Sequence, residues 1–346
     1  MATDTAKRAP ASLIFMILAA LAVLAALFSL TNGAYPLGTS DVMNLLLEPT
    51  AAKPAAHMVF FDVRMPRLVL GFLTGAVLAV SGTLLQGLFR NPLADPGLIG
   101  VSGGAALAAV SVIVLGGSWL SDWTILTGRW ALPLAAFMGS VLTTMVAWRV
   151  ASRSGSIAVA TLLLAGIAIN AVAGALTGLL TFYADDSELR SLTFWSMGSL
   201  GHASWEDLQV AGPWMLLALL LAPLLAKPLD AFALGESVAG HLGFSVQWVK
   251  RATVVLSALG TGAAVAVTGL IGFVGLVVPH LLRQIVGAGH RVLIPASGLA
   301  GGVLLVAADS LARVVVAPAE LPIGLMMSLL GGPFFLVLLM RMRIGA

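Results

Sequence analysis

The sequence predicts an all-α membrane protein with about ten transmembrane helices, and three observations carry the prediction. Of the 346 residues, 59% are hydrophobic and only 10% are charged, whereas a soluble domain carries about a quarter charged residues. Runs of about 20 apolar residues, the length that crosses a bilayer core, fill the chain nearly end to end. The 38 glycines indicate closely packed helices, because small residues let helix backbones approach one another in a membrane.

Ten predicted spans leave no room for a soluble domain, so we expect one transmembrane domain over residues 1–346. The first span follows Lys7 and Arg8, and we interpret it as retained rather than cleaved, because its apolar run is long for a signal peptide. The eighth is the weakest, since it is short and contains Pro279. The spans cover residues 12–30, 66–86, 98–115, 132–150, 158–182, 208–226, 251–269, 271–284, 292–312 and 322–340.

The distribution of basic residues sets the orientation of these spans. With the N-terminus inside, twelve of the 18 lysines and arginines fall in inner segments and six in outer ones. Because inner loops of membrane proteins carry the excess of lysine and arginine, we expect both termini to be cytoplasmic.

The stretch from Arg64 to Gly104 contains a break inside the membrane region. It reads R-M-P-R, then an apolar run, then N-P-L-A-D-P-G and a glycine-rich restart. Irregular backbone cannot face lipid, because its unsatisfied N–H and C=O groups are costly there. We interpret the stretch as part of a translocation pathway.

A short internal echo suggests an inverted repeat of spans 2–5 and 7–10. Gly75–Gly82 resembles Gly262–Gly269, and the two copies are predicted to run in opposite directions through the membrane. Inverted repeats are common in transporters, but a chain rich in Gly, Ala and Val also repeats itself by chance. Both interpretations stay open.

The sequence offers no energy source of its own. No G-x-x-x-x-G-K-[ST] loop occurs, and zero cysteines exclude disulfides and thiolate metal sites. The candidate intramembrane ionisable residues are Asp309, Arg313 and His280, and Asp309 and Arg313 have the i, i+4 spacing of an ion pair on one helix. A proton-coupled carrier would rest on Asp309 and His280 alone. No sequence motif indicates a membrane enzyme or a passive channel. We therefore expect a partner protein to supply the energy for transport.

The longest inner loop, Lys227–Arg251, is the predicted partner site. Leu234, Val238 and Leu242 fall at i, i+4 and i+8, which forms one apolar stripe on a short helix. Such a helix can lie on lipid, but its polar face carries no Lys or Arg, which favours docking of a soluble protein.

The motifs together resemble the permease subunit of bacterial ABC importers for iron–siderophore, haem and cobalamin, the FecCD-type family. The resemblance covers Arg64 to Leu338 and rests on R-M-P-R (64–67), N-P-L-A-D-P-G (91–97), L-L-L-A-G (162–166), A-L-G-E (233–236), G-F-V-G-L-V-V-P-H-L-L-R (272–283) and A-E-L-P-I-G (319–324). It implies a homodimer in the bacterial inner membrane, two cytoplasmic ATPase subunits that hold ATP and Mg, and a periplasmic substrate-binding protein. It implies no enzyme activity, bound cofactor, metal site or nucleic-acid contact for this chain.

The resemblance also implies residue roles. Arg64 and Arg67 match arginines that pair with acidic residues of the binding protein, although two interfacial arginines around a proline would look the same. Asn91 and Leu93 match a cytoplasmic gate, whose companion corresponds to Ala158 and Val159. The ATPase-coupling residues would be Leu234, Gly235, Glu236, Val238, His241 and Leu242.

The periplasmic gate segment, residues 185–201, looks most like that of the haem importers. Arg190 could meet a haem propionate, whereas the aromatic residues also suit an interfacial belt. A ferric siderophore or cobalamin is the alternative cargo. The implied pathway residues are Arg190, Thr193, Phe194, Trp195 and Met197.

Overall fold

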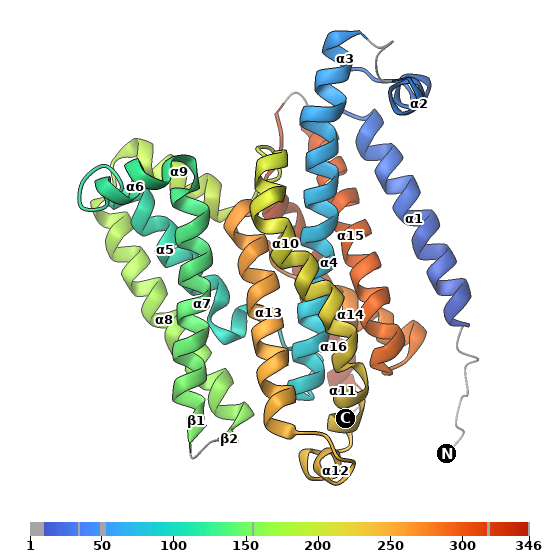
Figure 1. The fold of residues 1–346 in the computed structure, drawn as a ribbon, viewed down its shortest axis with the longest axis vertical. Coiled ribbons are helices and arrows are strands. Elements are labelled where there is room, and N and C mark those ends of the chain that lie inside the picture. Colours follow the sequence, from blue (N-terminus) through green and yellow to red (C-terminus); the bar gives the residue numbers. More distant parts are fainter. Residues whose placement is uncertain (1–9, 34, 49–52, 154–155, 317–318, 345–346) are drawn as a thin grey trace.

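The computed structural model describes residues 10–33, 35–48, 53–153, 156–316 and 319–344, and shows a bundle of helices (Figure 1). Lys7 and Arg8 lie outside the described residues. Seven helical segments are long and apolar enough to cross a membrane, and three shorter helices are also apolar. The ten helices that match the predicted spans are α1 (Ala11–Thr31), α4 (Met65–Phe89), α5 (Val101–Leu115), α7 (Ala131–Ala151), α8 (Val159–Tyr183), α10 (Trp205–Leu221), α13 (Val246–Thr268), α14 (Val274–Val286), α15 (His290–Val315) and α16 (Ile323–Ile344).

Shorter elements connect these helices, and several were not predicted. The all-α prediction needs one small correction, because the hairpin of β1 (Ser152–Arg153) and β2 (Ser156–Ile157) joins α7 to α8. The third span begins at Val101 instead of residue 98, since Pro96–Ile99 forms a separate 3-10 turn, η3. The remaining elements are α2 (Thr39–Leu47), α3 (Pro54–Met58), the π-helical η2 (Val59–Arg64), α6 (Ser121–Thr127), η4 (Gly128–Trp130), α9 (Asp186–Ser196), η5 (Ala222–Leu225), α11 (Ala226–Ala233) and α12 (Glu236–His241).

The connecting elements gather at two opposite ends of the bundle (Figure 1). One end, called here the α12 end, carries α12 and the β1–β2 hairpin, and α1 begins there. The other, the α9 end, carries α2, α3, α6 and α9. The charge pattern predicts that the α12 end faces the cytoplasm.

Glycines set how closely the central helix α4 packs against its neighbours. A Cβ on Gly75 would overlap the carbonyl oxygen of Gly301 in α15, and a Cβ on Gly82 would overlap that of Gly275 in α14. Glycine at these crossings permits backbone contact, which is how membrane helices pack without a hydrophobic driving force. Most of α4 is consequently buried.

Two long helices, α4 and α13, are each followed by a break and a short helix. After α4 the chain passes through η3 into α5, and after α13 it passes through residues 269–273 into α14. The two echo sequences lie in α4 and α13, which pack against each other and start at opposite ends of the bundle (Figure 1). Each break contains a non-glycine residue with positive φ, Arg90 at 50° and Phe273 at 67°.

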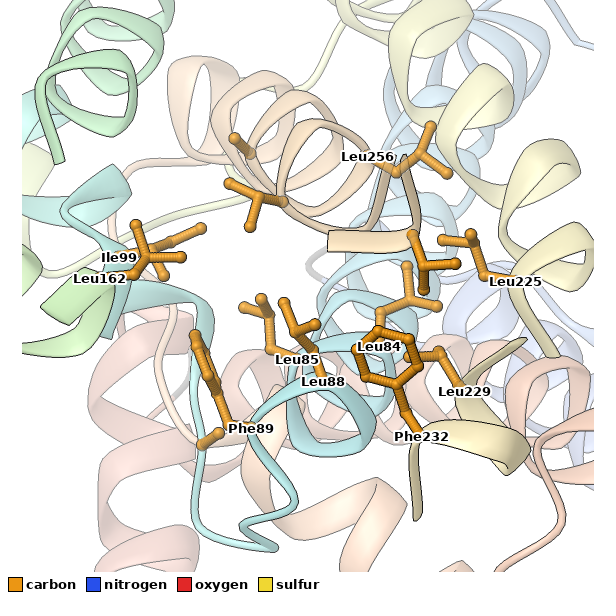
Figure 2. Packing of buried hydrophobic residues seen from close by; sticks show 14 of the residues in the cluster. Leu84, Leu85, Leu88, Phe89, Ile99, Leu162, Leu225, Leu229, Phe232 and Leu256 are labelled. Atoms are coloured by element: carbon orange, nitrogen blue, oxygen red, sulfur yellow. The ribbon is translucent and has the colours of Figure 1, made fainter. Parts of the chain in front are cut away.

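An apolar cluster near the α12 end holds the connecting elements onto the long helices (Figure 2). Leu84 and Leu88 of α4 belong to the same buried cluster as Leu229 and Phe232 of α11, which leads into α12. Ile99 of η3 joins this cluster too, so the break after α4 lies against protein.

Candidate functional sites at the two ends of the bundle

The short helix α12 and the residues beside it expose three apolar side chains, called here the α12 stripe. Leu234, Val238 and Leu242 are 68%, 41% and 59% exposed, respectively. The flanking residues Gly235 (φ 117°) and Gly243 (φ 87°) adopt backbone conformations that favour glycine. The three side chains of the predicted stripe are therefore exposed, but they do not lie on one helix, because Gly235 separates Leu234 from α12.

Behind α12 lies a buried lysine that the sequence reasoning counted only as an inner positive charge. The Lys250 Nζ donates hydrogen bonds to Glu236 Oε2 at 2.6 Å and to the Ile157 carbonyl at 2.7 Å. Glu236 is the first residue of α12, and Ile157 belongs to the β1–β2 hairpin. His241, by contrast, is exposed, and its Nδ1 lies 2.7 Å from the Ser237 carbonyl within the same helix.

A second polar contact fixes α11 against α15. The Asp230 Oδ1 lies 2.7 Å from His290 Nδ1 and accepts a 2.9 Å hydrogen bond from the His290 backbone N–H. A carboxylate at the first residue of a helix is favourable, because the helix N-terminus carries partial positive charge. This pair ties the segment before α12 to the long helix α15.

The turn after α4 re-enters the bundle instead of returning along its surface. Asn91 Oδ1 accepts from the Leu93 N–H at 2.9 Å, which closes the turn. The Gly97 carbonyl then accepts from Asn170 Nδ2 at 2.8 Å, and Asn170 lies near the middle of α8. The predicted gate residue Asn91 is exposed and Leu93 is half-buried.

At the α9 end, Arg67 lies in a buried ion cluster. Its guanidinium binds Asp309 at 2.8 Å and Glu320 at 2.9 Å. Asp309 also lies 3.3 Å from Arg313 on the same helix, so the predicted intrahelical pair is confirmed. Glu320 comes from the A-E-L-P-I-G motif, so the C-terminal part of the chain supplies both carboxylates that bind this arginine of α4.

Arg64 and Arg313 bind backbone carbonyls where α1 ends. Arg64 donates to the carbonyls of Leu30 and Tyr35, and Arg313 donates to that of Asn32 at 3.0 Å. Cations suit this position because the last carbonyls of a helix lack partners and carry partial negative charge. Arg64 and Arg67 are both buried, so their docking role stays a prediction.

A cavity of about 500 Å³ opens beside α9, within the range of about 300–1,000 Å³ typical of small-molecule sites. Of the predicted pathway residues, Phe194 and Trp195 line it, whereas Arg190, Thr193 and Met197 are not in its wall. His202 also lines the cavity, and no sequence motif pointed to this residue.

The segment before this cavity is a well-capped helix. Asp185 caps α9, and hydrogen bonds from the Glu188 backbone N–H and the Ser187 hydroxyl lower the pKa of its carboxyl. Among the described residues no group of three or more His, Asp or Glu side chains could hold a metal ion.

These features define a multi-span helical membrane protein with glycine-packed helices, two broken apolar segments and exposed apolar side chains around α12. The sequence matches the FecCD transport family over residues 21–341, and the chain belongs to this family. It is therefore an ABC transporter permease, a multi-pass protein of the inner membrane.

Curated relatives and one solved structure cover nearly the same length. The chain is 47% identical over 323 residues to the hemin transport system permease protein HmuU of Yersinia pestis, with 93% of this chain and 94% of HmuU covered. It is 40% identical to the cobalamin import system permease protein BtuC of Halobacterium salinarum, with 84% and 76% covered. An inward-facing metal-chelate type ABC transporter matches with a TM-score of 0.79 and 32% identity, over 95% of this chain and 99% of that one.

Proposed function

We propose that this permease imports haem into the cytoplasm by alternating access between two copies of the chain. The observation that carries the proposal is the 47% identity to a hemin permease over almost the full length of both chains. The cavity beside α9 supports it, because Phe194 and Trp195 provide flat apolar surface and His202 provides an imidazole. Cobalamin is the second candidate, because a cobalamin permease is 40% identical.

The energy comes from separate ATPase subunits that bind ATP and Mg. The exposed stripe of Leu234, Val238 and Leu242 supports this proposal, because a bare apolar surface at the end of a membrane domain fits a groove on a partner. Gly235, Glu236 and His241 complete the proposed coupling site.

The second copy would pack against α8. Small residues form one exposed face of this helix between larger apolar side chains, and nothing lies within 4 Å of a Cβ placed on Gly174 or Gly178. The small residues of this face are Ala168, Ala171, Gly174, Ala175 and Gly178. Close helix approach through glycine is favourable in membranes. In this arrangement Asn91, Leu93, Ala158 and Val159 would form the cytoplasmic gate, and the units that begin with α4 and α13 would form the inverted repeat.

A periplasmic binding protein would dock at the α9 end and deliver haem to the cavity. Docking on Arg64 and Arg67 would require the acidic residues of that protein to compete with the internal partners of these arginines. Charge reversal of both residues should abolish the stimulation of ATP hydrolysis by loaded binding protein. Unchanged stimulation would exclude the docking role of these two arginines, and it would not bear on which cargo is transported.

Uptake by proteoliposomes tests the function directly. The permease is reconstituted with its ATPase and binding protein, and haem, a ferric siderophore and cobalamin are offered separately. We expect uptake of haem alone, dependent on ATP and sensitive to vanadate. Preferential siderophore or cobalamin uptake would overturn the haem assignment, and uptake driven by a proton gradient without ATP would overturn the ABC mechanism.

A further inference from the structure

Lys250 is a charged side chain that lies almost completely inside the protein. Its side chain is only 4% exposed, yet it belongs to the first turns of α13 at the α12 end of the bundle. A buried ammonium is costly unless it is paired and hydrogen-bonded. Lys250 meets both conditions, since it binds one carboxylate and one carbonyl.

The two partners of Lys250 belong to two different elements at the α12 end of the bundle. Glu236, at 2.6 Å, is the first residue of α12, the proposed ATPase-coupling helix. The Ile157 carbonyl, at 2.7 Å, lies in β2, two residues before α8 begins. One ammonium group therefore joins the coupling helix to the start of α8.

A second bond strengthens the connection between α13 and the hairpin. The Gln247 Oε1 accepts from the Ile157 backbone N–H at 3.0 Å, so both backbone polar groups of Ile157 are bound to α13. Ile157 is itself buried. A displacement of α13 must therefore move the β1–β2 hairpin as well.

The bond to Glu236 differs from the others because it reaches the surface. The Glu236 side chain is 39% exposed, so a protein that binds the α12 stripe would also approach this carboxylate. Pulling Glu236 away would leave Lys250 buried without an anion, which is unfavourable. The ion pair should therefore persist as α12 moves.

We propose that Lys250 is a positioning residue that transmits displacement of α12 to the hairpin and to the N-terminus of α8. This inference rests on the proposed function, because α12 must be moved by the ATPase for the connection to carry a signal. It adds a specific route from the coupling helix to the gate residues Ala158 and Val159.

Spin-label distances in the reconstituted complex test the connection itself. The chain has no cysteine, so the G240C/A158C pair carries the only labels. The single variants G240C and A158C give the distances between the two copies, and the remaining distance in the double variant is that between α12 and the start of α8. We expect a narrow distance distribution in the parent protein, both without nucleotide and after vanadate trapping. K250M should broaden it, whereas R251M, which changes the neighbouring exposed basic residue, should leave it unchanged. An unchanged distribution in K250M would overturn the proposal.

Transport per ATP hydrolysed then tests what the connection does, with unlabelled protein. K250M should keep ATP hydrolysis but lose transport, whereas K250R, which keeps the positive charge and hydrogen-bond donors toward Glu236 and the Ile157 carbonyl, should retain part of that transport. If K250M does not fold, E236Q replaces it, because it weakens the same ion pair at a partly exposed position. Normal transport in a folded variant would overturn the proposal. If the parent complex itself neither hydrolyses ATP nor transports, the proposed function fails, while the distance result still reports on the connection.

Discussion

Asp309 is a buried carboxylate that binds two of the buried arginines at the α9 end. It pairs with Arg67 from α4 and with Arg313 from its own helix, and its side chain is only 5% exposed. Glu320 binds the same Arg67 but is 46% exposed. The two carboxylates therefore share Arg67 as a partner but differ in burial and in the additional pair of Asp309 with Arg313.

We expect Asp309→Asn to lower thermal stability much more than Glu320→Gln. Removing one member of a buried ion pair costs about 3–5 kcal/mol, whereas an exposed pair contributes about 1 kcal/mol or less. Thermal unfolding of purified protein in detergent measures both, and Asp122→Asn, an exposed acidic position, serves as the control. Equal effects of the two carboxylate variants would mean that Asp309 does not support the cluster.

The sequence could predict only part of this cluster. The Asp309–Arg313 pair follows from i, i+4 spacing on one helix. Arg67 is 242 positions away from Asp309, and helical periodicity carries no information on such a contact. For the same reason Lys250 was counted as a loop charge, although its two partners bury it.

Among the elements, helix α4 depends most on glycine. We expect Gly82→Ala to destabilise the protein, because the added methyl group would overlap the Gly275 carbonyl, and overpacking of this kind costs about 1–3 kcal/mol. Gly212→Ala in α10 meets nothing within 4 Å and should be neutral or stabilising, since alanine favours helix more than glycine does. Melting temperatures compare the two, and a loss of stability in Gly212→Ala alone would contradict this account.

The exposed stripe of α12 gives a prediction on partner binding. The double substitution Leu234→Ser/Leu242→Ser should weaken binding of the ATPase subunit by at least about tenfold, because each leucine that becomes buried contributes about 1.5–3 kcal/mol. Titration of the ATPase onto permease in nanodiscs measures the affinity. Ser237→Ala, which changes an exposed residue of the same helix, is the control. If the parent protein, the control and the double variant bind the ATPase with equal affinity, the α12 stripe does not contact the ATPase.

At the scale of the whole molecule, apolar run length predicted the seven long and three shorter apolar helices of the described residues, because crossing a bilayer requires an apolar run of a certain length. It missed α2, α3 and the β1–β2 hairpin, whose formation depends on tertiary contacts instead of periodicity. It also could not show that the turn after α4 reaches the middle of α8, since the Asn170–Gly97 bond joins residues far apart in the chain.

The proposed homodimer can be tested with cysteines placed in this cysteine-free chain. Ala171 is exposed on the small-residue face of α8, and Ala19 is exposed on α1. Under oxidation in membranes, A171C should form a covalent dimer and A19C should not. Cross-linking through α1 and not through α8 would move the interface to another face.

The carbonyls at the end of α1 also have a consequence for membrane insertion. Arg64 and Arg313 donate hydrogen bonds to these carbonyls. Helix α15 follows α1 by more than 250 residues in the sequence, so it is synthesised long after α1. Removal of α1 would take the Leu30 carbonyl from Arg64 and the Ser29 carbonyl from Arg313, so two buried guanidinium groups would each lose a hydrogen-bond acceptor. The first and last thirds of the chain must meet before the outer half of α15 is stable, which makes late insertion depend on the earliest helix.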